Sequence, residues 1–287
     1  MSANNKKTTE IFLCAICNIE SGTCNEDCKF CTQSVKYKAD IQRYKTKEIE
    51  QIVKEAKKAR ENGANGFCLV TAGKGLTDKR LAFVVEAAKA VKKEDLGLIL
   101  IACNGTASVE QLETLKAAGV DAYNHNLETA RDFYPEIVTT HTWDERYQTC
   151  KNVKEVGLRL VCGGIFGLGE TQEQRVSMLE SIASLEPMNV PLNFFHPNKA
   201  LPIVENSVTR EEAFELIALA RKMVPNAMKI MVAGGRELMF GDEQYKIFDK
   251  GANAFVIGDY LTTAGRTPAE DIAELEKQGI KVIRERN

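Results

Sequence analysis

The sequence predicts an α/β protein, a (β/α)8 TIM-type barrel that forms a single domain over residues 1–287. Short apolar runs alternate with longer segments of helical period along the whole chain. Eight apolar runs, with the helical segments that follow them, fit within about 250 residues, the usual length of this barrel. No stretch rich in Pro, Gly or Ser divides the chain into two parts. An open doubly wound sheet is the alternative architecture.

Eight apolar runs are expected to form the strands, because each is short and most are bounded by turn-forming residues. These runs are residues 11–19, 66–71, 96–103, 121–126, 158–163, 190–195, 228–233 and 254–257. The helices are expected between them, at residues 46–62, 77–93, 108–118, 142–156, 171–185, 209–224 and 268–278. We expect Thr46 and Thr77 to cap helices and Gly63, Gly119 and Gly157 to end them.

The composition excludes several classes of protein. Hydrophobic residues make up 44% of the chain and charged residues 27%, which is typical of a folded protein rather than a disordered one. A net charge of −2 gives no basic footprint, so we expect no nucleic-acid partner. We expect no membrane span, because no apolar run approaches ~18 residues, and residues 11–17 lack a signal-peptide cleavage site. The nine cysteines then indicate metal binding or catalysis in a reducing cytoplasm rather than disulfides.

Three cysteines lie close together after the first predicted strand, at Cys24, Cys28 and Cys31. A loop with this spacing can direct three thiolates toward an iron–sulfur cluster. Three ligands for a four-iron cluster leave one iron free to bind a substrate or cofactor. The spacing, with Phe30 before the last cysteine, resembles that of the radical S-adenosylmethionine (SAM) enzymes, in which SAM binds that iron and an aromatic residue lies near its adenine. A zinc knuckle is the alternative, but no second cysteine pair or nearby histidine follows.

Polar side chains gather where the fourth predicted strand ends. Asn124, Asn126 and Glu128 are two residues apart, so they face the same side of an extended strand and form a polar wall at the barrel mouth. Alternatively, the asparagines cap turns and the glutamate is solvated. His125 has the opposite parity, and we interpret it as a packed or hydrogen-bonded structural histidine. We assign no metal role to the two other histidines, which lack a partner at ligand spacing: His141 and His196.

A glycine-rich segment, residues 163–170, follows the fifth predicted strand. It lacks the Lys-Ser/Thr of a phosphate-binding loop. Its pattern of Gly163, Ile165, Gly167 and Glu170 resembles the radical SAM segment that packs beside the adenine. A glycine-rich turn that needs unusual backbone angles is the alternative.

Beyond the superfamily, the chain resembles the biotin synthase family over essentially its whole length. The motifs that carry this resemblance are residues 24–33, 67–68, 123–129, 162–170, 233–237 and 261–263. The resemblance implies insertion of sulfur between two unactivated carbons of dethiobiotin to form biotin. It implies that reduced SAM yields a 5′-deoxyadenosyl radical, and that a second iron–sulfur cluster donates the sulfur. It also implies a flavodoxin or ferredoxin as electron donor, and a homodimer.

The resemblance assigns roles to residues that match the family motifs. Cys24, Cys28 and Cys31 would hold the [4Fe-4S] cluster that reduces SAM. Glu128 occupies the place of a family aspartate that bonds the SAM ribose. The full set of SAM contacts would be Phe30, Asn126, Glu128, Arg146 and Ile165. The residues near dethiobiotin would be Asn124, Asn193 and Thr262. No side chain is expected to act as a catalytic acid or base, because the cofactors carry the reaction.

The second cluster is where the sequence departs from the family. Cys68 and Cys103 match two of its three cysteine ligands. The third is expected at Val161, but the cysteine is Cys162, and a shift of one residue reverses the side chain's direction along a strand. Cys162 would reach the cluster only if the strand ends or bulges there, and the family's arginine ligand is replaced by Met231.

Cys14 occupies a place where the family has a serine near that arginine. Our hypothesis is that Cys14 compensates for the arginine, so that the second cluster has mainly thiolate ligands and is larger than [2Fe-2S]. The alternative is that Cys14 is an inert core thiol. We interpret Cys17 and Cys150 as structural.

Two other functions remain open at this point. A hydrogenase maturase or an amino-acid-modifying radical SAM enzyme would share the cysteine loop and the barrel, but not the motif at residues 123–129 together with Cys68 and Cys103. A non-catalytic iron–sulfur or zinc-binding protein would have no need for the glycine-rich segment beside the adenine.

Overall fold

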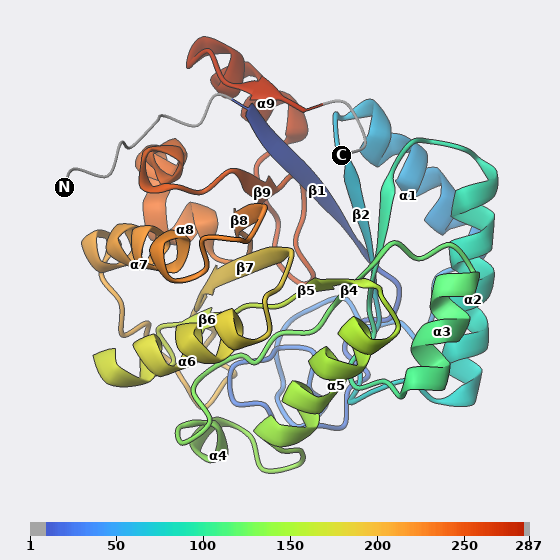
Figure 1. The fold of residues 1–287 in the computed structure, drawn as a ribbon, viewed down its shortest axis with the longest axis horizontal. Coiled ribbons are helices and arrows are strands. Elements are labelled where there is room, and N and C mark those ends of the chain that lie inside the picture. Colours follow the sequence, from blue (N-terminus) through green and yellow to red (C-terminus); the bar gives the residue numbers. More distant parts are fainter. Residues whose placement is uncertain (1–9, 284–287) are drawn as a thin grey trace.

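The strands form one parallel sheet that closes on itself in the computed structural model, which describes residues 10–283 (Figure 1). In the described chain the strands are β1 (Glu10–Asn18), β2 (Gly66–Val70), β3 (Ile99–Cys103), β4 (Ala122–Asn124), β5 (Arg159–Val161), β6 (Gly164–Phe166), β7 (Asn189–Phe194), β8 (Lys229–Val232), β9 (Ala254–Val256) and β10 (Lys281–Val282). The barrel closes because β1 pairs with β2 on one side and with β9 on the other. The predicted (β/α)8 barrel is confirmed, and the ends of the predicted domain, residues 1–9 and 284–287, lie outside the described residues.

The fifth position of the barrel is shared by two short strands. Both β5 and β6 pair with β7, and Cys162 and Gly163 lie between them. A side chain at Gly163 would not fit, because its Cβ would lie 1.8 Å from the carbonyl oxygen of Pro191. The backbone of this strand therefore passes unusually close to β7. The additional strand β10 extends the sheet by pairing with the first residues of β1.

The helices pack around the barrel, with α1, α2 and α3 on one side and α6 and α7 on another (Figure 1). They are α1 (Ile49–Glu61), α2 (Asp78–Lys93), α3 (Val109–Ala117), α4 (Tyr134–Ile137), α5 (Trp143–Glu155), α6 (Gln172–Ser184), α7 (Arg210–Met223), α8 (Arg236–Phe240) and α9 (Pro268–Lys277), with a 3₁₀ segment η1 (Gly241–Lys250). Thr77 caps α2 as predicted, accepting a hydrogen bond from the backbone N–H of Arg80. The prediction for Thr46 is wrong: α1 begins three residues later, after Glu48, because the chain at Lys47 is still hydrogen-bonded to Ile19.

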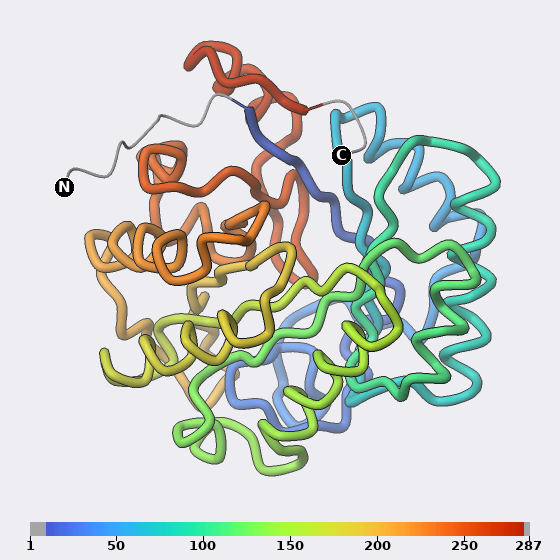
Figure 2. Tube along the Cα trace, viewed as in Figure 1, coloured from blue at the N-terminus to red at the C-terminus, as the bar shows by residue number. Residues whose placement is uncertain are grey.

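Alternate strand residues face two different apolar cores. On β1, Phe12 and Cys14 face the interior of the barrel, whereas Leu13 and Cys17 face the layer between strands and helices. This alternation follows from the two-residue period of a strand. The loop after β1 lies against the segment around α4 (Figure 2), where the N–H of Lys29 donates to the carbonyl of Ile137 at 2.9 Å. The mouth of the barrel is therefore built from loops that are far apart in sequence.

Candidate active site

The cysteine loop after β1 forms one side of a cavity of about 180 Å³ that Cys24, Cys28 and Cys31 line together. The loop is fixed in place by Asp27, whose carboxylate accepts hydrogen bonds from the backbone N–H groups of Thr139 (3.0 Å) and Thr140 (3.2 Å). These bonds join the loop to the chain after α4. The three cysteines predicted to act together are thus brought to one place.

The cysteine thiols fit a cluster of several irons better than a single metal ion. Within residues 10–283, no three Cys, His, Asp or Glu side chains surround a point that would hold one metal ion. In a cluster, by contrast, the cysteines bind through separate irons. Burial raises the pKa of Cys31 to about 12 and also raises that of Cys28. The thiols therefore lose their protons only when iron binds, as is usual for metal ligands.

An ion pair that is mostly buried also lines this cavity. Glu128 Oε1 lies 2.9 Å from Arg146 Nη2, and Arg146 Nε donates to the backbone carbonyl of Asn126 at 2.6 Å. Burial raises the pKa of Glu128, although Arg146 and Asn126 act in the opposite direction. The backbone of Glu128 has φ +70°, an uncommon value for a residue with a side chain, and such strain is often found at functional sites. Its second oxygen, Oε2, is buried without a partner among the described residues, so it is available to a ligand hydroxyl.

We expect the Glu128→Gln substitution to weaken SAM binding by about 10- to 100-fold, because a hydrogen bond to a charged group contributes about 1.5–3 kcal/mol. Glu128→Asp should retain most of the affinity, since it keeps the carboxylate. Equilibrium dialysis of SAM against the reconstituted proteins would measure both. Equal SAM affinity in the Gln variant and the unchanged protein would show that Glu128 does not contact SAM.

A deeper cavity of about 380 Å³ lies inside the barrel, and Cys14, Cys68 and Cys103 all line it. Cys68 and Cys103 are hydrogen-bonded to each other, and this bond together with burial raises the pKa of Cys68. The residue of β2 beside Cys14 is a glycine: a Cβ on Gly66 would lie 2.9 Å from the Phe12 ring and 3.2 Å from Cys14 Sγ. Met231, where the family has arginine, also lines this cavity. Cys31 of the cysteine loop lines this cavity too, so the structure brings together three further thiols and no arginine among the described lining residues.

The prediction that Cys162 joins this group is wrong. Val161 lines the cavity, whereas Cys162 is fully buried on the outer side of the strand. Its Sγ lies 3.8 Å from the Sγ of Cys150, on α5. The strand does break after Val161, but Ile165 again faces the cavity, so the alternation of side chains is preserved across the break. Cys162 therefore points away from the barrel interior, as a residue adjacent to an inward-facing one must.

The residues expected near dethiobiotin also line the deep cavity: Asn124, Asn193 and Thr262. Asn193 is already engaged with the backbone, donating to the carbonyl of Gly164 at 3.1 Å and accepting from the N–H of Gly234 at 2.8 Å. Asn124 Oδ1 is buried and has no partner in the described part of the chain. It is therefore the better placed of the two to accept a hydrogen bond from a ligand N–H. The remaining expected SAM contacts, Phe30, Asn126 and Ile165, line the deep cavity as well, and Phe30 and Asn126 also line the cavity beside the cysteine loop.

Sequence reasoning missed one histidine at the site. His141 Nε2 lies 3.5 Å from Cys28 Sγ, and its Nδ1 lies 2.8 Å from the hydroxyl of Tyr134. No local pattern signals this contact, because His141 is 113 residues from Cys28. His125 is buried, but its Nε2 has no hydrogen-bond partner among residues 10–283, and it lines the cavity beside the cysteine loop.

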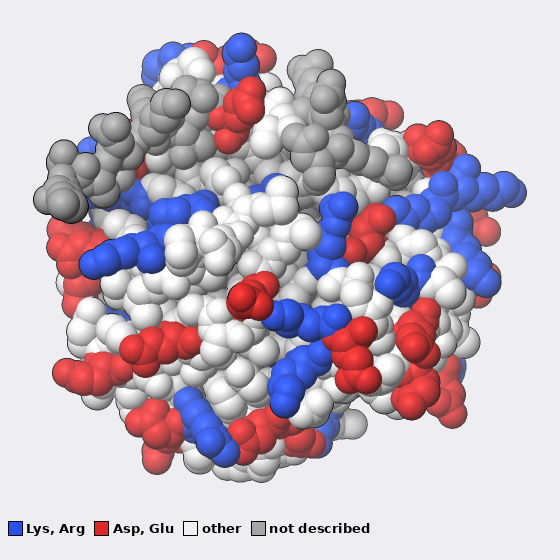
Figure 3. Space-filling view, viewed as in Figure 1, with Lys and Arg blue, Asp and Glu red and all other residues white. Residues whose placement is uncertain are grey.

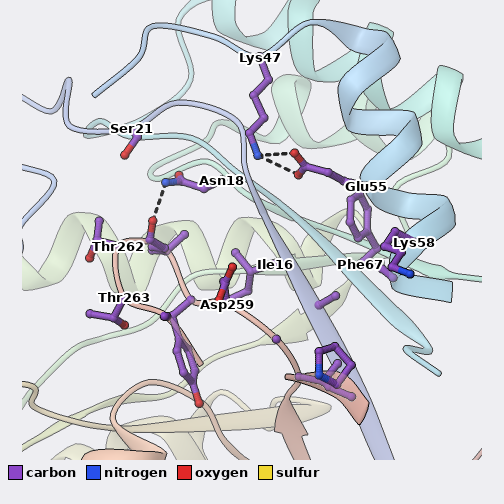
Figure 4. A pocket seen from close by; sticks show the side chains of 18 of the residues that line it. Ile16, Asn18, Ser21, Lys47, Glu55, Lys58, Phe67, Asp259, Thr262 and Thr263 are labelled. Atoms are coloured by element: carbon purple, nitrogen blue, oxygen red, sulfur yellow. Dashed lines mark hydrogen bonds and ion pairs between the residues drawn. The ribbon is translucent and has the colours of Figure 1, made fainter. Parts of the chain in front are cut away.

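A third cavity, of about 500 Å³, lies outside the barrel between β1, α1 and the loop after β9 (Figure 4). There Lys47 points toward Glu55, with its Nζ 2.7 Å from Oε1, and Asn18 donates to the carbonyl of Leu261 at 2.8 Å. Thr262 and Thr263 line both this cavity and the deep one. Residues 260–263 therefore separate the barrel interior from the outer cavity.

Two family models match the chain. The radical SAM superfamily matches residues 19–182, and the Biotin and Thiamin Synthesis associated domain matches residues 191–281. The second match begins within β7 and contains β8 and β9, and these three strands complete the same closed barrel. None of the described helices is both long and apolar enough to cross a membrane.

Curated relatives are similar over nearly their whole length. The chain is 67% identical over 273 residues to the biotin synthase of Aliarcobacter butzleri, covering 95% of this chain and 96% of the relative. It is 54% identical over 270 residues to a biotin synthase of Campylobacter jejuni, covering 94% and 97%.

Solved structures support the fold. The FeFe-hydrogenase maturase HydG from Carboxydothermus hydrogenoformans superposes with a TM-score of 0.83 at 19% identity, over 96% of this chain and 68% of that one. Methylornithine synthase superposes with a TM-score of 0.82 at 20% identity, over 96% and 84%.

Proposed function

The chain belongs to the biotin synthase family of radical SAM enzymes, and from that premise we propose how its own residues carry out the conversion of dethiobiotin to biotin. One observation carries the proposal. The deep cavity with three thiols adjoins the cavity beside the cysteine loop, and both are lined by Cys31, Cys103, Asn124, Asn126 and Glu128. A substrate in the deep cavity would therefore lie between the two groups of cysteines.

The residues at the mouth of the barrel would hold SAM and the first cluster. Cys24, Cys28 and Cys31 would supply three thiolates, which would leave one iron of a [4Fe-4S] cluster for SAM. Arg146 presents a guanidinium that suits a carboxylate, and Glu128 has a free oxygen for a ribose hydroxyl. Their mutual ion pair holds both side chains in place before SAM binds. Phe30 and Ile165 supply apolar contacts for the adenine.

The deep cavity would hold the second cluster through Cys14, Cys68 and Cys103. When bound, the two clusters supply an electron to SAM and sulfur to the substrate carbons. Burial raises the pKa of the Cys14 thiol to about 12, so this side chain stays neutral until iron displaces its proton. Because three thiols replace the family's set of ligands that includes an arginine, we propose a second cluster larger than [2Fe-2S].

The polar groups around the substrate would orient dethiobiotin. Asn124 Oδ1 can accept from a ureido N–H, and Asn193 retains one N–H of its amide for the ureido oxygen. Thr262, held 2.8 Å from the hydroxyl of Thr32, forms part of the wall toward the outer cavity. This wall would help to exclude water from a reactive radical.

We extend the proposal to the protein's partners and environment. The electron donor would be a flavodoxin or ferredoxin, since reduction of SAM needs a low-potential cluster. All nine cysteines are free, which suits the reducing cytoplasm where thiols persist. A homodimer is carried over from the family.

Anaerobic reconstitution followed by Mössbauer spectroscopy, iron and sulfide counts and a biotin assay would test the proposal. We expect two distinct clusters, a second cluster with four irons, and biotin formed from dethiobiotin. A two-iron second cluster would mean that the family's donor survives without its arginine. A single four-iron cluster would overturn the proposed role of the deep cavity.

A further inference from the structure

We propose that residues 35–45, which cover the outside of the cysteine loop, are the docking surface for a small acidic electron-donor protein. This inference rests on the proposed function, because it needs a four-iron cluster in that loop. In the electron transfer, the reduced donor loses one electron and the cluster gains it, with no bond made or broken.

The first support is an unbalanced positive charge. Residues 35–45 contain Lys36, Lys38, Arg43 and Lys45 but only one acidic residue, Asp40, which gives a net charge of +3 in a chain of net charge −2. All four basic side chains are exposed. None of them forms an ion pair with a carboxylate of residues 10–283, and Arg43 donates instead to the backbone carbonyls of Gly22 and Tyr37. Their charge therefore remains available to a partner.

The second support is position. The N–H of Val35 donates to the carbonyl of Cys24 at 2.8 Å, and the hydroxyl of Tyr37 donates to the carbonyl of Asp27 at 2.6 Å. Residues 35–37 are thus hydrogen-bonded directly to the loop that carries the three cysteines. A protein seated on this segment would be separated from the cluster by one layer of chain.

The third support is an exposed apolar side chain among the basic residues of this segment. Val35 is 50% exposed, one of few large apolar side chains so exposed among residues 10–283. A shallow depression beside it is lined by Tyr37, Lys38 and Arg43. An apolar centre within a charged rim is the usual arrangement of a transient protein interface.

On the face drawn in Figure 3, basic and acidic side chains are interspersed. A positive segment on a protein of negative net charge would orient an acidic partner toward itself as the two approach. We therefore expect the segment mainly to raise the rate at which the donor associates. This increase should become smaller as salt screens the charges.

The test compares two triple charge reversals in the reconstituted protein. One variant carries Lys36→Glu, Lys38→Glu and Lys45→Glu; Arg43 is kept because it bonds the backbone. The control carries Lys89→Glu, Lys93→Glu and Lys222→Glu, exposed lysines near the C-terminal ends of α2 and α7. Stopped-flow spectroscopy would follow cluster reduction by a reduced, acidic flavodoxin at low and high salt. Dithionite serves as a small reductant that needs no docking.

We expect the first variant to be reduced by flavodoxin at least tenfold more slowly at low salt, with the difference shrinking at high salt. Its reduction by dithionite should be unchanged, and the control variant should behave like the unchanged protein with both reductants. Equal flavodoxin rates in the two variants would overturn the docking surface. Failure of dithionite to drive SAM cleavage in the unchanged protein would overturn the proposed function itself, and the docking surface with it.

Discussion

Replacing Cys14 by alanine is expected to remove the second cluster and to lower biotin formation by at least about 100-fold, while the first cluster and the cleavage of SAM persist. The physical reason is that, apart from Cys31 of the cysteine loop, the deep cavity offers only three thiols among its described lining residues, and Met231 lacks the charge of the arginine it replaces. Loss of one of three thiolates leaves two, which is too few to hold a cluster. Iron and sulfide counts, with separate assays of methionine and biotin, would measure the effect.

Cys162→Ala is the matched control, because it removes a buried cysteine from the neighbouring strand without touching the cavity. We expect it to keep both clusters and to lower the free energy of unfolding by about 1 kcal/mol, the usual effect of a small core truncation. Unchanged second-cluster content in Cys14→Ala would instead make Cys14 an inert core thiol. Loss of that cluster in Cys162→Ala would show that the strand rearranges when iron binds.

The order of strands and helices could be predicted because the chain repeats one pattern, a short apolar run followed by a segment of helical period. Backbone geometry sets the spacing of apolar residues in each, about two residues in a strand and 3.6 in a helix. Every predicted strand is present, and so is every predicted helix, with bounds that differ by a few residues. The elements that were missed are β6, β10, α4 and α8, which contain too few residues to show a period, and the 3₁₀ segment η1, whose ten residues do not follow the α-helical period. Thr46 failed as a cap because a long-range hydrogen bond holds the next residue in the loop.

The roles of the candidate site residues could be predicted where they depend on neighbours in the sequence. They could not be predicted where they depend on how distant segments of the chain pack together. The spacing of Cys24, Cys28 and Cys31 indicates a shared ligand by itself. Counting along the chain raised doubt about Cys162 but could not decide whether the strand break would turn its side chain inward. Nor could it show that Asn193 is occupied by the backbone or that His141 touches Cys28, because both contacts depend on how separate loops pack.

A second large effect is expected at the other end of the loop after β9, where Asp271→Ala should lower the free energy of unfolding by about 3–5 kcal/mol. Asp271 on α9 and Arg236 on α8 are both wholly buried, with Nη2–Oδ2 and Nη1–Oδ1 distances of 2.9 and 3.1 Å. Tyr245 also donates to Oδ1, at 2.6 Å. Removing the carboxylate would leave a guanidinium buried with too few partners, since Arg236 Nε already has none in the described chain. Urea denaturation of the reconstituted protein would measure the loss.

The double variant Arg236→Met with Asp271→Leu separates charge from packing. If the cost of Asp271→Ala comes from an unpaired buried charge, removing both charges should recover most of the stability, as apolar replacements of buried ion pairs often do. The guanidinium carbon of Arg236 also lies 4.2 Å from the ring centre of Phe255. A double variant as unstable as Asp271→Ala would therefore mean that Arg236 stabilises the barrel through this aromatic contact. Arg236 is also linked to the loop after β9 through Glu237, which accepts hydrogen bonds from Arg236 Nη2 at 3.0 Å and from the hydroxyl of Tyr260 at 2.8 Å.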